Sequence, residues 1–366
     1  MQHLISIVDA NTQHRQTLAE ALKSNYAVQA YDTPVNALAG MNINRPRVIL
    51  VGQKVGAGSG VNFIRDLRKE QFLGEIPVIF VIDNEDFRIV EQMRETAIKD
   101  YLVKPYPRSS LFGAITKHIN KSVEQSWAAL PSTQRKALED SLRAFNSIAE
   151  QIAAGKPLPF DSVTEPCSAI VDVVAKNEIG PMMHRIKAHD NFTYVHSLRF
   201  ATLMSLFGKA IGLPKDQQIL IASGGMLHDI GKMTIPRDLL TKQGALSPAD
   251  WKVLRGHVAT SVKLLATNEN IPKGVMSMVG NHHERIDGSG YPRALPGSEI
   301  NRLGRMAGII DVFCALTDRK PYKRTVPAHA ALETMATEMK TQLDQTLLHT
   351  FKEILLETVP VDAPAD

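Results

Sequence analysis

The sequence predicts a multidomain protein in which a doubly wound α/β domain precedes an all-α domain, with a helical segment between them. Its 366 residues are many for a single domain. Short apolar runs separated by helix-length segments occupy the first third of the chain. From residue 161 onward the apolar periodicity is almost wholly helical.

The composition is that of an ordinary globular protein, 44% hydrophobic and 22% charged. The net charge of +4 is mild and forms no long basic block, so no nucleic-acid binding is expected, although a local basic site for a phosphorylated small molecule remains open. The two cysteines, Cys167 and Cys314, form no CxxC pair, which favours a reducing cytoplasm. No apolar run reaches about eighteen residues, so we expect a cytoplasmic protein without membrane insertion.

Residues 1–122 are expected to form the α/β domain. A helix-like stretch at Gln16–Lys23 follows the first of several β-prone apolar runs. These runs lie at 4–8, 48–51, 76–82 and 101–103. Alternating strands and helices predict a parallel sheet covered on both faces.

This segment resembles the receiver domains of bacterial response regulators. The resemblance rests on Val8-Asp9 at the end of the first strand, on the apolar fourth strand at 76–81, and on the run from Asp100 to Pro105. Lys104-Pro105 is the most specific part of it.

The chain departs from receivers at the site that accepts phosphate. That chemistry needs carboxylates for Mg²⁺ and an attacking aspartate. Gly52 stands where the aspartate is expected, Ala10 replaces a second acidic residue, Ile82 replaces a hydroxyl residue, and Lys104 alone remains. We therefore expect a pseudo-receiver with no phosphoacceptor, which acts by contact in dimerisation or partner binding, or is a folded appendage.

Residues 123–160 are expected to form a helical linker. Leu138, Leu142, Phe145 and Ile148 are spaced as on one face of a helix, which ends at the Gly/Pro cluster of residues 155–159. The stripe fits either a coiled coil in a homodimer or packing on its own domain.

The domain from 161 to 366 carries residues typical of metal sites. Five of the chain's 12 histidines and two aspartates form the candidate ligand set. The set is His196, His228, Asp229, His257, His282, His283 and Asp311. These side chains bind first-row transition metals, so one polynuclear site is predicted. Lys232 follows Asp229 by three residues and could contact a phosphate oxygen or a metal-bound hydroxide.

This domain resembles the HD superfamily of metal-dependent phosphohydrolases and, more narrowly, the HD-GYP family. The broad match lies in Gly225–Lys232, and the narrow one in Gly280–Pro292, which includes the Gly-Tyr-Pro of the family name. Shorter matches at Tyr194–Ser197, Gly256-His257 and Ile310–Val312 extend it over roughly residues 185–355.

The resemblance implies an iron or manganese site that hydrolyses cyclic dinucleotides, chiefly cyclic di-GMP, to linear pGpG or GMP. It implies that Asp229 bridges the metals as a catalytic ligand and that Lys232 stabilises the phosphate or the hydroxide. The other implied ligands are His228, His257, His282, His283 and Asp311. Family members with three metals have a carboxylate four residues before His196, where this chain has Phe192, so we expect two metals and a weak or substrate-facing His196.

The resemblance also implies contacts to the substrate. Lys320 and Lys323 are expected to add positive charge, with Lys320 replacing the family's usual arginine. Tyr291 is expected to be exposed on a loop that is either a lid or a structural turn. Cys314, where the family has a second aspartate, is expected to be a buried thiol without a metal role. The histidines that fit no ligand spacing are expected at the surface or at helix caps: His184, His189, His329 and His349.

Three functions remain open from the sequence. The first is a cyclic di-GMP phosphodiesterase. The second is a hydrolase of another phosphorylated substrate, such as a hybrid cyclic dinucleotide. The third is a catalytically weak adaptor that binds cyclic di-GMP or partner proteins. The partner classes to expect are GGDEF-type signalling proteins and a second copy of this chain.

Overall fold

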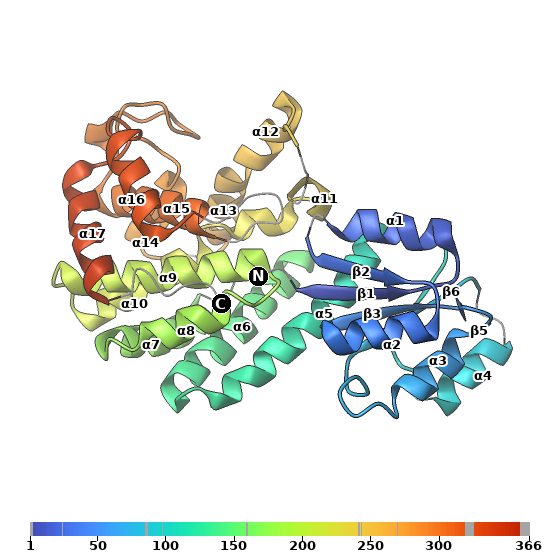
Figure 1. Ribbon diagram of the computed structural model, residues 1–366. Helices are drawn as coiled ribbons and strands as arrows, with labels where there is room; N and C mark the ends of the chain where they lie inside the picture. Colours follow the sequence, from blue (N-terminus) through green and yellow to red (C-terminus); the bar gives the residue numbers. More distant parts are fainter. Residues whose placement is uncertain are drawn as a thin grey trace. The chain divides into compact units, whose positions relative to one another are not determined.

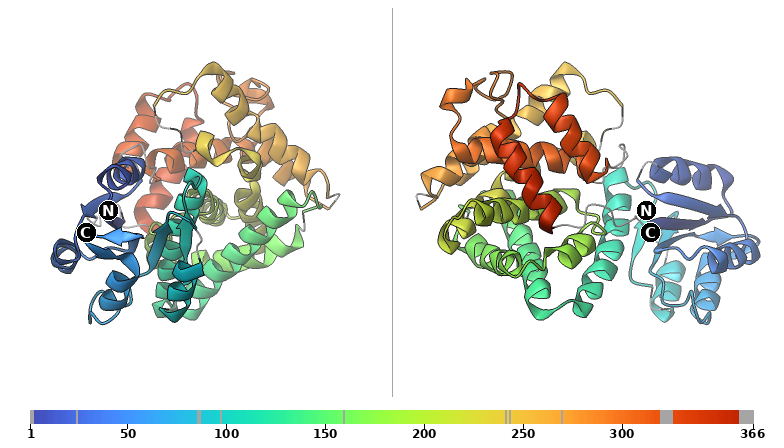
Figure 2. Two further views of the ribbon diagram at one scale, coloured as in Figure 1. Left: turned by 90° about the vertical axis from the view of Figure 1, so that its right-hand side faces the viewer. Right: turned by 60° about the vertical axis from the view of Figure 1, so that its left-hand side comes forward.

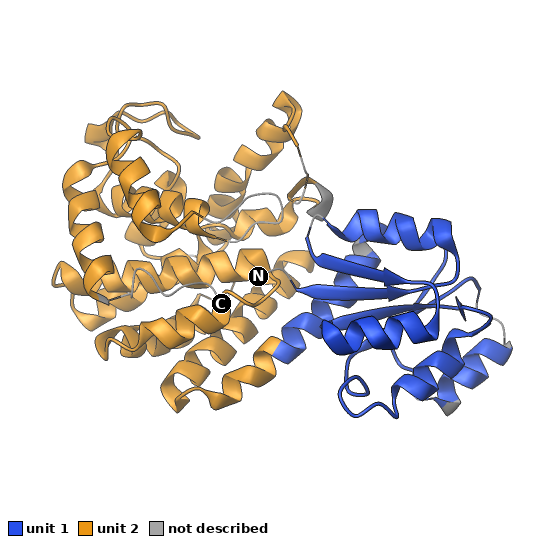
Figure 3. Ribbon diagram, in the orientation of Figure 1, with its two compact units in different colours: residues 1–122, 365–366 blue, residues 123–364 orange. Residues whose placement is uncertain are grey.

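The computed structural model describes residues 3–358 except 24, 85, 86, 97, 159, 241, 243, 269 and 319–325. The chain divides into two compact units, residues 1–122 and 123–364 (Figure 3). In the part that is described, no helix combines the length and the apolar character that a membrane span requires.

The first unit contains a five-stranded parallel sheet with the strand order β2-β1-β3-β6-β7. The strands are β1 (Leu4–Val8), β2 (Ala27–Tyr31), β3 (Val48–Gly52), β6 (Val78–Ile82) and β7 (Tyr101–Val103). In β1, Ile7 pairs with Ala30 of β2 on one side and with Leu50 of β3 on the other. A small hairpin of β4 (Lys54–Val55) and β5 (Gly58–Ser59) follows β3.

Helices cover both faces of this sheet. In Figure 1, α1 lies on one face and α2 and α3 lie on the other. The helices are α1 (Thr12–Lys23), α2 (Pro34–Ile43), α3 (Gly60–Leu67), α4 (Phe87–Glu95) and α5 (Arg108–Ser126). Every residue of β3 and β6 is buried, as a parallel sheet with two covered faces requires. The predicted α/β class is confirmed.

The second unit is built of helices (Figures 1 and 2). In chain order they are η1 (Trp127–Ala129), α6 (Ser132–Ala153), α7 (Asp161–Ala175), α8 (Ile179–Ile186), α9 (Phe192–Ala210), α10 (Lys215–Leu227), η2 (Ile230–Thr234), α11 (Arg237–Leu240), α12 (Pro248–Arg255), α13 (His257–Leu265), α14 (Lys273–Asn281), η3 (Gly297–Glu299), α15 (Arg302–Thr317), α16 (Ala328–Thr337) and α17 (Gln345–Thr358). The predicted helical class is confirmed.

The core of this unit surrounds α9. Its residues from Tyr194 to Gly208 are buried with the exception of His196, because the helix is apolar on nearly all sides. The stripe on α6 joins the same core through Leu138, Phe145 and Ile148. Of the two alternatives for this stripe, the structure therefore shows packing within the helix's own unit.

The segment predicted as a helical linker, residues 123–160, is not a single helix. The chain leaves α5 at Ser126, makes a 3₁₀ turn, and begins α6 after Pro131. Proline lacks the N–H of a helix interior and disfavours helical backbone in the residue before it, so Pro131 separates the two helices.

Candidate metal centre

Three histidines of the predicted set stand directly at helix ends. His228 follows the last residue of α10, His282 follows α14, and His257 begins α13 just after α12 ends. Each ring places Nδ1 against the backbone carbonyl three residues earlier, at 2.5 to 2.7 Å. A carbonyl only accepts hydrogen bonds, so Nδ1 carries the proton in all three rings. Each histidine thereby donates to a carbonyl in the last turn of the preceding helix, where helices lack intrahelical donors.

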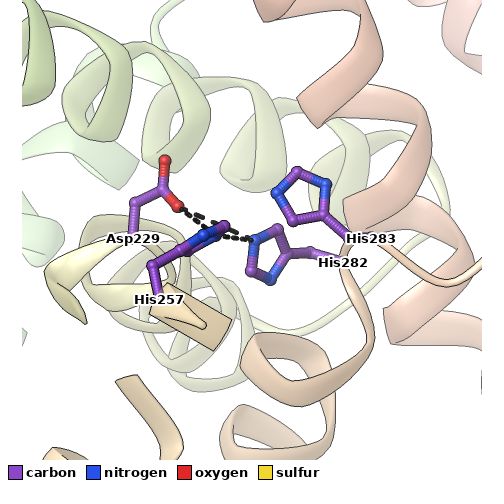
Figure 4. A group of neighbouring side chains, drawn as sticks. All are labelled: Asp229, His257, His282 and His283. Atoms are coloured by element: carbon purple, nitrogen blue, oxygen red, sulfur yellow. Dashed lines mark hydrogen bonds and ion pairs between the residues drawn. The ribbon is translucent and has the colours of Figure 1, made fainter. Parts of the chain in front are cut away.

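Because Nδ1 carries the proton, each Nε2 has a free lone pair. These nitrogens converge: Nε2 of His257 lies 3.4 Å from Nε2 of His282, and Nε2 of His228 lies 3.1 Å from Nε2 of His196. In Figure 4 the carboxylate of Asp229 points toward the rings of His257 and His282. Neutral nitrogens that face each other in this way repel unless a cation lies between them.

The two oxygens of Asp229 face different histidine pairs. Oδ1 lies 3.1 Å from Nε2 of His257 and 3.7 Å from that of His282. Oδ2 lies 3.3 Å from Nε2 of His228 and 3.4 Å from that of His196. One carboxylate therefore connects two groups of nitrogen ligands.

Asp311, on α15, divides its oxygens in the same way. Its Oδ2 lies 3.1 Å from Nδ1 of His283, and its Oδ1 lies 3.6 Å from Nε2 of His196. The structure thus brings all seven predicted ligands together as two groups, Asp229/His257/His282/His283 and His196/His228/Asp311. His196 takes part in this cluster despite Phe192.

These residues fit divalent metal ions. Within each group, ligand atoms lie within 4.8 Å of one another. Two ligands about 2.1 Å from one ion are about 3.0 to 3.4 Å apart at octahedral to tetrahedral angles. Oδ1 of Asp229 is buried and accepts no hydrogen bond from the described residues. A buried anionic oxygen without a donor is stabilised when it binds a cation.

Burial and neighbouring charges set the protonation states. Burial lowers the pKa of His228 to about 4 and that of His283 to about 3, against the opposing pull of Asp229 and Asp311 respectively. Burial would raise the pKa of Asp229, but Lys232 and His228 hold it well below its usual value. At neutral pH His228 and His283 are therefore neutral and Asp229 is anionic, the forms that bind metals.

Close packing fixes the turn after Asp229. A Cβ on Gly231 would lie 2.1 Å from the carbonyl oxygen of His257, and the Gly231 N–H donates to Oγ of Ser261 at 2.9 Å. Only glycine lets η2 approach α13 this closely. In this turn the ammonium of Lys232 contacts Oδ2 of Asp229.

Sequence reasoning missed a buried ion pair behind His196. Nδ1 of His196 lies 2.8 Å from Oδ2 of Asp318, and Asp318 also contacts the guanidinium of Arg199. The side chains of Arg199 and Asp318 are 5% and 8% exposed. The carboxylate orients the ring so that Nε2 faces the cluster. The sequence offered one signal for this pair: Arg199 stands one helical turn after the predicted ligand His196, within a largely apolar stretch.

The loop from Asp287 to Pro292 is joined to the site by the backbone N–H of Tyr291, which donates to the carbonyl of His283 at 3.2 Å. Just after the loop, the carboxylate of Glu284 accepts hydrogen bonds from the backbone N–H groups of Arg293 at 2.8 Å and Leu295 at 3.0 Å. The expectation that Tyr291 is exposed is wrong. Its ring is partly buried and stacks on His283, with the centroids 4.6 Å apart, because an aromatic face packs well on an imidazole.

The remaining predicted residues have mixed outcomes. Lys320 and Lys323 lie outside the described residues. Cys314 is fully buried, as expected. The surface prediction for His189 is wrong: it is 3% exposed, stacks on Trp127, and accepts a hydrogen bond from the N–H of Asn191. His184, His329 and His349 are exposed.

In the described part of the first unit, the carboxylate of Asp9 lies beside Gly52, where the sequence comparison with receivers places the attacking aspartate. A Cβ on Gly52, at the end of β3, would lie 2.4 Å from the Asp9 carboxyl carbon. Oδ2 of Asp9 pairs with Nδ1 of His14 at 2.5 Å, and Nε2 of His14 contacts the Tyr106 hydroxyl at 3.0 Å. Lys104 pairs with Asp83 at 3.0 Å. The lack of a phosphoacceptor stays a prediction.

The sheet order of the first unit and the histidine–aspartate cluster of the second define a two-domain protein, with a receiver-type fold and a helical domain whose residues are grouped as for divalent metals. Comparison with known families agrees. The HD domain family matches residues 181–347, and the response regulator receiver domain family matches residues 5–116. The chain therefore combines a response regulator receiver domain with an HD domain.

Curated proteins of bacteria resemble the chain over much of its length. Cyclic di-GMP phosphodiesterase PA4108 of Pseudomonas aeruginosa is 28% identical, over 70% of this chain and 64% of that protein. The cyclic di-GMP phosphodiesterase response regulator RpfG of Xanthomonas campestris is 27% identical, over 90% of this chain and 81% of that protein. The 3'3'-cGAMP-specific phosphodiesterase 3 of Vibrio cholerae is 31% identical, over 46% of this chain and 37% of that protein.

A solved structure supports the fold. An HDG"Y"P protein from Bdellovibrio bacteriovorus covers 68% of this chain, and the match covers 80% of that protein at a TM-score of 0.50. The two sequences are 17% identical, so the likeness concerns the fold alone.

Proposed function

We propose that the chain is a metal-dependent phosphodiesterase that hydrolyses cyclic di-GMP to linear pGpG or GMP in bacterial second-messenger signalling. The names of the curated relatives support the substrate. The observation that carries the proposal is the arrangement of Asp229, whose two oxygens each face a separate pair of histidine Nε2 atoms. This arrangement suits two adjacent cations.

The proposed ligands form two sets that share both carboxylates. His257, His282 and His283 would hold one ion, and His196 and His228 the other. Asp229 and Asp311 would each offer one oxygen to either side. Iron or manganese suits such a mixture of imidazole and carboxylate. When bound, such a pair of ions neutralises the phosphodiester and activates water as a nucleophile.

The chain's own groups orient and charge the site. Lys232 keeps Asp229 anionic and, from 26% exposure, can reach a phosphate oxygen. Lys320 and Lys323 would add positive charge to the substrate site. Tyr291 packs on His283 and would form a wall beside the substrate.

A hybrid cyclic dinucleotide is the second candidate substrate, favoured by the relative that is specific for 3'3'-cGAMP. Both substrates contain guanine and the same phosphodiester linkages, so the metal cluster does not distinguish them. For the first unit we propose a role by contact, with GGDEF-type proteins or a second copy of the chain as partner.

Product analysis after metal loading tests the function. Protein loaded anaerobically with Fe²⁺ or Mn²⁺ is incubated with cyclic di-GMP, 3'3'-cGAMP and cyclic di-AMP, and the products are separated by chromatography. His282→Ala should abolish product because it removes an Nε2 ligand, whereas His184→Ala removes an exposed histidine and should leave the rate unchanged. Metal-loaded protein that binds cyclic di-GMP without forming product would instead indicate an adaptor.

A further inference from the structure

A continuous series of stacked groups leads from the metal cluster to the protein surface. Tyr291 stacks on the ligand His283. The guanidinium carbon of Arg255 lies 5.2 Å from the centroid of the Tyr291 ring and 5.6 Å from the ring of Trp251. One cation thus lies between two aromatic rings, the inner of which contacts a ligand of the centre.

The outer end of this series is exposed. Trp251 is 47% exposed, Arg255 is exposed, and α12, which carries both, has no buried residue. The helix lies at the periphery of its unit (Figures 1 and 2). An indole ring and a guanidinium held together at the surface make a flat platform that is already ordered before a ligand binds.

We propose that Trp251 and Arg255 form the subsite for a guanine base of the substrate, a specificity determinant separate from the metal cluster. The inference rests on the proposed function. A base is joined to its phosphate through a single sugar, so a dinucleotide whose phosphate lies at the metal centre extends its base along the wall that Tyr291 forms.

The chemistry of the two side chains selects guanine. An indole face stacks on any base, and such stacking tolerates every sequence. Arginine donates two parallel hydrogen bonds that match O6 and N7 of guanine, whereas adenine presents an amino donor at the position of O6. Trp251 therefore supplies affinity, and Arg255 discriminates between the purines.

Intrinsic fluorescence can test this subsite without turnover. The chain has two tryptophans, of which Trp127 is 1% exposed, so nucleotide-dependent quenching reports on Trp251. The probes are GMP and AMP, added to metal-loaded protein. We expect quenching at concentrations about 10-fold lower for GMP than for AMP, and loss of this preference in Arg255→Ala. Equal quenching by both nucleotides, or none, would overturn the proposal.

Kinetics separate the subsite from the catalytic centre. Arg255→Ala should lower kcat/KM for cyclic di-GMP by roughly 10- to 100-fold through KM, and Arg255→Lys should not restore it because lysine lacks the planar fork. Trp251→Ala should likewise raise KM, and Trp251→Phe should restore most of the loss. Metal content and hydrolysis of bis(4-nitrophenyl) phosphate, which has no base, should stay unchanged.

The matched control is Lys252→Ala, which removes the same charge from the same exposed helix. If Lys252→Ala weakens cyclic di-GMP turnover as much as Arg255→Ala does, the effect comes from the loss of positive charge in general, and the proposed guanine subsite is refuted. If the subsite variants also lose activity on bis(4-nitrophenyl) phosphate, their role is structural. Unaltered protein that hydrolyses no cyclic dinucleotide refutes the proposed function, and the GMP and AMP titration still decides whether the base subsite exists.

Discussion

The ion pair behind His196 gives a sharp prediction for Asp318→Ala. The substitution leaves the Arg199 guanidinium, which is 5% exposed, without its carboxylate and with Thr317 Oγ1 at 3.0 Å as a neutral hydrogen-bond acceptor. Removing one member of a buried pair typically costs about 3 to 5 kcal/mol, because the remaining charge stays out of water. The low exposure means that solvent does not screen this cost.

Urea denaturation of metal-free protein measures this cost. Asp318→Ala should lower the free energy of unfolding of the helical unit by about 3 to 5 kcal/mol. The double variant Arg199→Met/Asp318→Leu removes both charges and should recover most of this loss. A loss below about 1 kcal/mol in the single variant, as for an exposed pair, would refute the reasoning.

Metal binding distinguishes orientation of His196 from stability. Both variants remove the acceptor for Nδ1 of His196, so both should bind Mn²⁺ about 10- to 100-fold more weakly at the ion that His196 is proposed to hold. Stability that recovers in the double variant without recovery of metal affinity identifies Asp318 as a positioning residue. Recovery of both would assign it a structural role alone.

Three further outcomes follow from the described contacts. Chelation should lower the Tm by roughly 5 to 10 °C, compared with protein at a free metal concentration about 100 times the Kd. Calorimetry measures this difference, and an unchanged Tm would argue against a metal site. Gly231→Ala, whose Cβ would lie 2.1 Å from the carbonyl oxygen of His257, should lower the free energy of unfolding by about 1 to 3 kcal/mol and weaken metal binding. Unchanged stability in urea denaturation would contradict the close packing of η2 on α13. Acetyl phosphate should leave no acid-stable aspartyl phosphate on the receiver domain, and Gly52→Asp alone should not restore phosphorylation because Ala10 and Ile82 still lack the acidic and hydroxyl groups that receivers have there.

That the seven candidate ligands lie together could be predicted because metal chemistry restricts the residue types and the HD-GYP resemblance fixes their positions. Their division into two groups could not, because that depends on the direction of each carboxylate oxygen after α10 and α15 have packed. Asp318 and Arg199 were missed for a similar reason. Residues 199 and 318 are 119 positions apart in the sequence, so their side chains meet only in the folded domain.

In the receiver domain, too, the sequence predicts which residues are replaced but not the contacts that they make. The replacements at Gly52, Ala10 and Ile82 can be identified from the sequence. The contacts of His14 with Asp9 and Tyr106 cannot, because Tyr106 follows the last strand and reaches His14 only when the sheet has formed.

The histidines at the helix ends have a consequence for how the centre could change in evolution. In His228, His257 and His282, one ring nitrogen terminates a helix while the other faces the cluster. Cysteine or aspartate could bind a metal at these positions but could not cap the carbonyl as well, so a change of ligand would also unsettle a helix. The choice of metal is thus tied to the architecture, and substitutions deep in the core, by moving helix ends, could retune the centre without touching a ligand.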